Sequence, residues 1–161
     1  MVKRFRINGA VGALLDEYEK AIEELKFVIQ ALSNDELSQI VDNKTKDEDC
    51  RSIQTILTHV VSAGYTYVVE IRKWCGETID YRDKVSLTTA KEYQTALDMM
   101  FAYNESLFED YPKLKLEEMD NSKKMKVRWG QQYDVEQLIE HAIVHVLRHR
   151  RQIEKLKLRL Q

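Results

Sequence analysis

The sequence is poor in the two residues that most often interrupt helices. Only five glycines and one proline, Pro112, occur among its 161 residues. This scarcity argues against a turn-rich β architecture and favours long helices, because short hairpins depend on turn residues of these types. The chain also lacks a basic excess. Its formal net charge of −2 gives no support to a function in binding nucleic acid.

Cysteine and long hydrophobic runs are scarce as well. The two cysteines, Cys50 and Cys75, form no CxxC pair and no spacing typical of a zinc ribbon. The first apolar stretch is broken by Asp16 and Glu17, so it is too short for a signal peptide, and no run approaches membrane-spanning length. We therefore expect a cytoplasmic protein with free thiols and no membrane partner.

The residues that are present describe a globular helical protein. Hydrophobic residues make up 43% of the chain and charged residues 32%, and the length suits a single domain, residues 1–161. Apolar residues recur at helical spacing over four stretches, which are residues 9–32, 52–76, 88–109 and 134–158. We predict an all-α fold, a four-helix bundle with long crossover connections.

Capping patterns mark the starts of three of these helices. Ser52 precedes the second helix as an N-cap. Capping boxes pair Thr89 with Glu92 at the third helix, and Asp134 with Gln137 at the fourth.

The connecting segments carry different signals. Residues 33–50 are polar and predict a loop with one helical turn near residues 35–40. Residues 124–129 alternate between polar and apolar types before Gly130. This alternation predicts a short β-hairpin or ordered crossing loop between the third and fourth helices.

The four histidines are the most informative residues for function. His141, His145 and His149 recur at every fourth position, and His59 stands alone upstream. Imidazole is the commonest protein ligand for transition metals, and residues four apart on a helix can share an ion. His141 and His149 lie two turns apart, about 12 Å along the axis, so all three cannot reach one ion. A three-histidine site must combine His59 with one adjacent pair.

The apolar face of the last helix discriminates between the two pairs. This face centres near the direction of Val146. At about 100° per residue, His149 lies about 50° from the centre, His145 about 90° and His141 about 130°. The pair His145 and His149 therefore borders the core, and His141 points mostly to solvent. His59 also lies about 130° from the apolar centre of its own helix, so spacing alone leaves partly exposed rim histidines as the ordinary alternative.

In the surroundings of these histidines the sequence resembles a known family, the DinB-like (DinB/YfiT-like) metal-binding four-helix bundles. Members have a histidine near the start of the second helix in a context like S-I-x-x-I-L-x-H, which residues 52–59 match. Their last helix carries H-x-x-x-H followed by R-G-Q-I or R-x-Q-I, which residues 145–153 match. The sequence departs from this pattern in Arg151, where glycine is common, and in the additional His141.

The resemblance implies that His59, His145 and His149 hold one divalent metal ion, zinc or nickel, and that the chain forms a homodimer. Three imidazoles leave an open coordination position, as in catalytic rather than structural sites. The family implies a metal-dependent hydrolase, or a thiol-dependent S-transferase or isomerase, acting on a small-molecule substrate between the second and fourth helices. His141 could substitute for a ligand or support one. The alternative is a non-enzymatic helical dimer or partner-binding module with incidental metal binding.

Other polar residues near these histidines suggest no general base. Glu70 and Glu140 lie near the same flank by helical angle, and Arg148 or Arg150 could hold an anion. Each is expected to be an ordinary solvated charge. Gln152, one turn beyond the last histidine, is a candidate to orient a ligand ring, and a polar residue at the core edge is the alternative.

Overall fold

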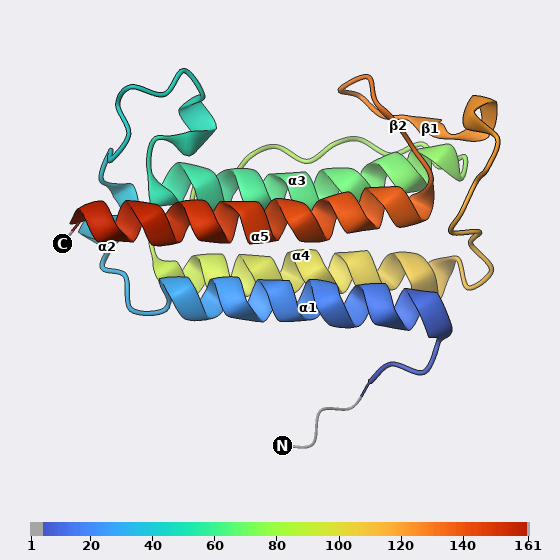
Figure 1. Ribbon diagram of the computed structural model, residues 1–161, viewed down its shortest axis with the longest axis horizontal. Coiled ribbons are helices and arrows are strands. Elements are labelled where there is room, and N and C mark those ends of the chain that lie inside the picture. Colours follow the sequence, from blue (N-terminus) through green and yellow to red (C-terminus); the bar gives the residue numbers. More distant parts are fainter. Residues whose placement is uncertain (1–4, 161) are drawn as a thin grey trace.

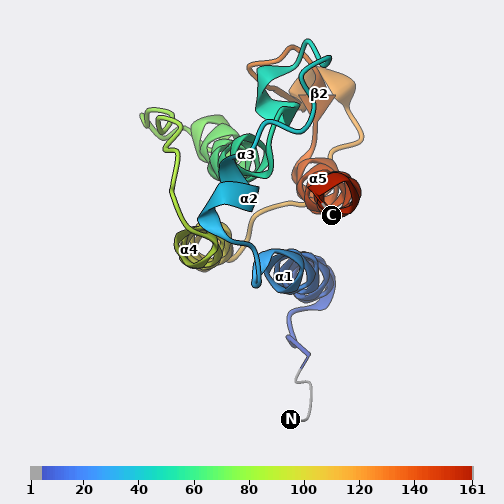
Figure 2. The ribbon, with the colours of Figure 1, turned by 90° about the vertical axis from the view of Figure 1, so that its left-hand side faces the viewer.

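The computed structural model describes residues 5–160 and confirms the predicted all-α fold. Within that range, four long helices form a bundle (Figure 1). They are α1 (Gly9–Ile29), α3 (Ile53–Trp74), α4 (Ala90–Asp110) and α5 (Val135–Leu160). In the end-on view α1 lies against α4 and α5, and α3 also lies against α4 and α5 (Figure 2). Each helix therefore buries one apolar stripe against two neighbours.

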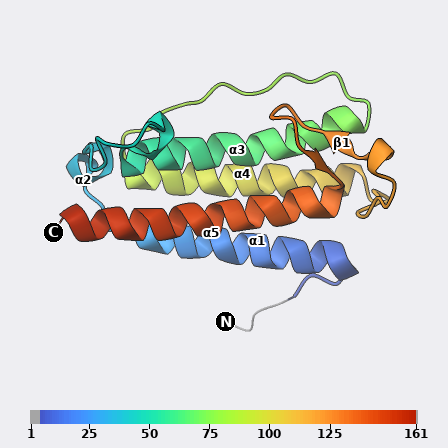
Figure 3. The same ribbon diagram turned by 45° about the horizontal axis from the view of Figure 1, so that its top comes forward.

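The helices run in two parallel pairs, which requires a crossover connection. α1 and α5 run in one direction, and α3 and α4 run in the other (Figure 1). Residues 77–88 return along the length of the bundle to join α3 to α4 (Figure 3). The connection from α1 to α3 stays at one end and contains α2 (Asn34–Ser38) and the 3₁₀ turn η1 (Glu48–Cys50). The structure thus confirms a long crossover and the helical turn expected in the polar segment.

The predicted capping patterns are present. Ser52 and Thr89 both form capping boxes at the starts of α3 and α4. At α5 the Asp134 carboxylate accepts a hydrogen bond from the Gln137 backbone N–H at 2.9 Å. The first helix ends at Ile29 rather than at residue 32, because the chain turns there to begin α2 with a new capping box.

The connection from α4 to α5 contains the predicted hairpin in a very short form. After the 3₁₀ turn η2 (Asn121–Lys123), the strands β1 (Met125–Lys126) and β2 (Gln132–Tyr133) pair antiparallel. Gly130 has φ +92°, a left-handed conformation that favours glycine, and its N–H donates to the carbonyl of Val127 at 2.8 Å. This turn places the residues on either side of Gly130 above α3 and α5.

The core contains one unusually close approach, between α3 and α4 at Gly64. A Cβ atom added to Gly64 would lie 2.3 Å from Sδ of Met100. The buried Asn104 side chain of α4 donates to the Gly64 backbone carbonyl of α3 at 3.4 Å, so a hydrogen bond also joins the two helices here. None of the described helices has both the length and the apolar character needed to cross a membrane.

We expect Gly64→Ala to lower the free energy of unfolding by about 1–3 kcal/mol, because the new methyl group must displace Met100. Urea denaturation followed by circular dichroism measures the change. In a Met100→Ala background the same substitution is expected to cost nothing, since the clashing atoms are gone. An equal loss in both backgrounds would show that Met100 is not the cause.

Candidate metal centre

Helix α5 presents His145 and His149 to the interior of the bundle. Their relative exposures are only 6% and 4%. Because the two residues are four apart, their rings occupy successive turns of one face. The ring centroids lie 4.4 Å apart and the two Nε2 atoms 3.2 Å apart. Both rings are buried more deeply than the edge position that the helical angles indicated.

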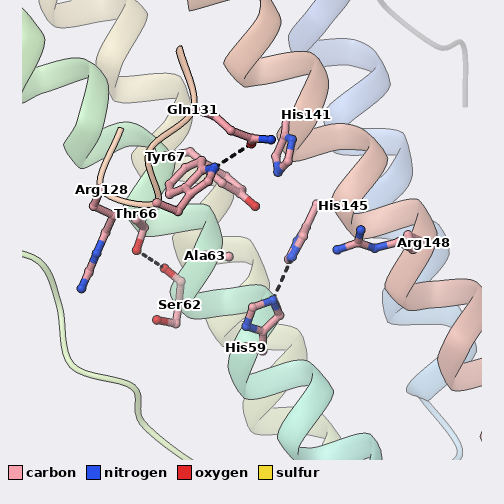
Figure 4. A pocket seen from close by; sticks show the side chains of 11 residues that line it. His59, Ser62, Ala63, Thr66, Tyr67, Arg128, Gln131, His141, His145 and Arg148 are labelled. Carbon is pink, nitrogen blue, oxygen red and sulfur yellow. Dashed lines mark hydrogen bonds between the residues drawn. The ribbon is translucent and has the colours of Figure 1, made fainter. Parts of the chain in front are cut away.

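Helix α3 supplies His59, two turns after the Ser52 cap. Its Nε2 lies 2.9 Å from Nε2 of His145 across the groove between α3 and α5 (Figure 4). The side chain keeps 28% exposure, which agrees with a position at the rim of its own helix. A rim residue can still converge with the α5 pair, because α3 and α5 lie side by side.

The three histidines converge closely enough to share one ion. One possible ligand atom from each of His59, His145 and His149 lies within 4.8 Å of the others. A Zn–N distance of about 2.0–2.1 Å places the nitrogens of a tetrahedral site about 3.3 Å apart. The Nε2 atom of His145 lies 2.9 Å from that of His59 and 3.2 Å from that of His149, close to this value. Small movements of the rings would therefore suffice to admit a divalent ion.

Two further side chains orient the rings by contacting their Nδ1 atoms, on the side away from the converging Nε2 atoms. An Asp49 carboxylate oxygen lies 3.1 Å from Nδ1 of His59, and the Gln152 amide oxygen lies 3.0 Å from Nδ1 of His149. Such hydrogen bonds fix the ring orientation and raise the basicity of the other nitrogen. Gln152 thus contacts a histidine ring of the triad, as the first of its two sequence-based interpretations expected. Asp49 was missed, because it lies in a polar segment without periodicity and reaches His59 only through the turn η1.

These hydrogen bonds also determine which nitrogen lone pairs face the centre. A carboxylate and an amide oxygen only accept, so the neutral rings of His59 and His149 carry their proton on Nδ1. Both Nε2 lone pairs then face Nε2 of His145. His145 has at most one Nε2 proton, so it can donate to only one of these two lone pairs, and the other is left without a donor. A cation shared by all three relieves this conflict, so the donor set fits a metal ion.

Burial keeps the three rings in the form that binds metals. Desolvation, with the neighbouring histidines adding to it, lowers the pKa of His145 to about 2. Desolvation likewise lowers the pKa of His149 to about 4. It also lowers the pKa of His59, although Asp49 opposes that shift. The imidazoles are therefore neutral near pH 7, and an ion does not have to displace protons from them.

Asp49 is itself held by the crossover segment. Lys84 donates to both Asp49 carboxylate oxygens, at 2.8 and 2.6 Å.

We expect Asp49→Ala to weaken metal binding about 10–100-fold, because His59 loses the group that orients it. Competition with a chromogenic chelator measures the affinity. Glu48→Ala removes the same charge from the same turn without touching a histidine and is expected to leave the affinity unchanged; equal losses in both variants would refute the role of Asp49.

His141 does not point to solvent as predicted. It is half-buried, with its ring centroid 5.5 Å from that of Tyr67 and 6.1 Å from that of Trp129. The Tyr133 hydroxyl lies 3.3 Å from its Nδ1. The prediction was wrong because the hairpin between α4 and α5 covers this face of α5, which the periodicity of one helix cannot reveal. His141 is not among the three histidines that the described structure groups together.

A pocket of about 420 Å³ lies beside the triad, between α3, α5 and the hairpin loop (Figure 4). His59 and His145 form part of its lining. Most of the exposed lining is apolar, and Tyr67, Trp129 and His141 contribute aromatic walls. A small molecule in this pocket would therefore contact two of the three converging histidines.

The acidic and basic residues that the sequence suggested near the histidines differ in their surroundings. Glu70, expected to be a solvated charge, is only 7% exposed. Its Oε1 accepts hydrogen bonds from the Tyr81 hydroxyl at 2.9 Å and the Arg128 backbone N–H at 3.0 Å. Glu140 is exposed as expected, and Arg150 forms an ion pair with a glutamate of α1. Glu70 thus ties the crossover segment and the hairpin loop to α3.

The fold and the site together define a four-helix bundle in which histidines from two helices converge beside a pocket. The chain belongs to the DinB family, whose model matches residues 7–158. This match confirms the resemblance drawn from the two histidine motifs. A comparison with curated proteins found no match.

Proposed function

We propose that this protein is a metal-dependent enzyme that acts on a small molecule at His59, His145 and His149. The observation that carries the proposal is the convergence of three neutral imidazoles at the edge of a pocket of about 420 Å³. Imidazole ligands suit zinc and nickel, which are the ions we propose. Catalytic metal sites differ from structural ones in having three protein ligands and an open position, and this site offers three.

A divalent ion in such a site can lower the pKa of a water molecule, polarise a carbonyl group or hold a thiolate. These chemistries correspond to a hydrolase or to a thiol-dependent S-transferase or isomerase. The chain's own contribution is to orient the ligand rings through Asp49 and Gln152 and to place a substrate against the aromatic walls. Glu70 is engaged by two hydrogen bonds, so we assign it a positioning role rather than that of a general base.

The test uses protein purified without a histidine tag. Elemental analysis is expected to find about one divalent ion per chain, and a screen of esters, amides and thiol adducts is expected to find turnover that is lost in His145→Ala. Metal-free protein whose stability is unchanged when the three histidines are replaced would instead favour the non-enzymatic module. Metal without turnover on any substrate class would contradict the enzymatic proposal and leave the metal site intact.

We further propose that the protein is a homodimer and that it resides in the cytoplasm. Light scattering after size-exclusion chromatography tests the first point. The expected mass is twice the 19.0 kDa of one chain. A mass of 19.0 kDa at micromolar concentration would contradict it.

A further inference from the structure

Two arginines that line the pocket lack a carboxylate partner among residues 5–160. They are Arg128 and Arg148. Arg6, Arg72 and Arg150 form ion pairs with carboxylates, whereas the other described arginines without such a pair, Arg82, Arg151 and Arg159, do not line this pocket. The two pocket arginines therefore leave uncompensated positive charge beside the histidine triad. A pocket with one sign of charge and apolar walls concentrates ligands of the opposite sign.

Arg148 stands at the metal end of the pocket. It follows His145 by three residues on α5, and its side chain extends toward His145 (Figure 4). Its positive charge contributes to the lowered pKa values of His141 and His145, and it opposes the rise that burial causes in the pKa of Tyr67. The charge of Arg148 therefore acts on the histidines and on the aromatic wall alike.

Arg128 is held in place at the other side of the pocket (Figure 4). Its backbone N–H donates to the buried Glu70, and its guanidinium carbon lies 4.3 Å from the centre of the Tyr81 ring. Stacking on an aromatic face uses the face of a guanidinium group and leaves the N–H groups at its edge available. Arg128 is thus positioned by the protein without being neutralised.

The remaining lining favours a flat apolar group. Tyr67 and Trp129 lie edge to face, with ring centroids 5.9 Å apart. His141 packs against both rings. Aromatic walls of this kind bind the body of a ligand, while a few charged groups fix its orientation.

We propose that the pocket takes a small organic anion, in which a carboxylate or phosphate group binds Arg148 and a flat apolar body lies against Tyr67 and Trp129. The proposal deepens the proposed function and rests on it for one point only, that the reacting group lies beside the triad. Arg128 adds a second positive charge for the same ligand at the far side of the pocket. Carboxylate and phosphate share this recognition chemistry, so the experiment has to separate them.

Isothermal titration calorimetry of the metal-loaded protein, in a buffer free of carboxylate and phosphate, tests the proposal. Benzoate and phenyl phosphate are the anionic probes, and benzamide is the neutral counterpart. At least one anion is expected to bind about tenfold more tightly than benzamide, since charge-assisted hydrogen bonds contribute most of this difference. The tighter of the two anions identifies the preferred group. Arg148→Gln is expected to remove the preference, while Arg151→Gln, which changes an exposed arginine of the same helix outside the pocket, retains it.

Two results would overturn the proposal. Benzamide binding as tightly as both anions would show that the pocket does not select charge. An anion preference that survives undiminished in Arg148→Gln would show that Arg148 does not hold the anion, and its persistence in the double variant Arg128→Gln/Arg148→Gln would assign the anion to the metal ion. The metal content of each sample is measured separately. Protein that contains no metal but still prefers an anion through Arg148 would refute the metal-dependent function and support the anion site.

Discussion

Replacing His145 by alanine is expected to abolish stoichiometric metal binding. His145 is the central member of the triad, because its Nε2 faces Nε2 of both His59 and His149. Its loss leaves one imidazole on each of two helices, with no adjacent pair to hold an ion. Elemental analysis of untagged protein is expected to fall from about one ion per chain to background.

The additional histidine provides the matched control. His141→Ala removes the same side chain from the same helix, one turn earlier, and its ring is stacked 6.3 Å from that of His145. Because His141 packs among Tyr67, Trp129 and His145 but supplies no atom to the converging group of ligands, its replacement is expected to leave the metal content unchanged. Loss of metal in His141→Ala with retention in His145→Ala would reverse the assignment.

The second large effect is on stability. Adding zinc to metal-free protein, at a free concentration of 100 times the dissociation constant, is expected to stabilise the fold by about 2.7 kcal/mol. For a chain of this length, that corresponds to a rise of roughly 5–10 °C in the midpoint of thermal unfolding. The ion binds the folded state because only folding brings His59 to the α5 pair.

Differential scanning calorimetry with and without zinc measures this shift. The His145→Ala variant is the control, since any general effect of zinc on the unfolded chain or on surface carboxylates persists in it. The midpoint of its thermal unfolding is expected to move by less than about 1 °C, because zinc no longer stabilises the folded state when the site is lost. Equal shifts in both proteins would show that zinc stabilises the fold elsewhere.

The sequence predicts the framework of this protein well because the framework depends on local signals. Helical periodicity located α1, α3, α4 and α5, and the side chains of Ser52, Thr89 and Asp134 marked three of their starts. The same geometry selected His145 and His149 over His141, because facing the core is a property of one helix. These features require no knowledge of how distant segments meet.

The predictions that were wrong or incomplete depend on contacts between segments that are far apart in the sequence. Helical angle placed His59 at the rim of α3, and only the family resemblance paired it with α5. Asp49 reaches His59 through the path of η1, and nothing in its own segment reveals that path. His141 and Glu70 were expected in solvent, but the hairpin loop and the crossover segment cover them. Periodicity describes one element at a time, so it cannot report what a loop covers.

A crystal of the metal-loaded, untagged protein, with diffraction data collected at the absorption edge of the ion, tests the central claim most directly. We predict a single anomalous peak per chain, about 2.0–2.1 Å from one ring nitrogen of each of His59, His145 and His149. The open coordination position of the ion is expected to face the pocket. A fully loaded crystal whose peak lies away from these three rings, or is held by His141 in place of one of them, would contradict the account.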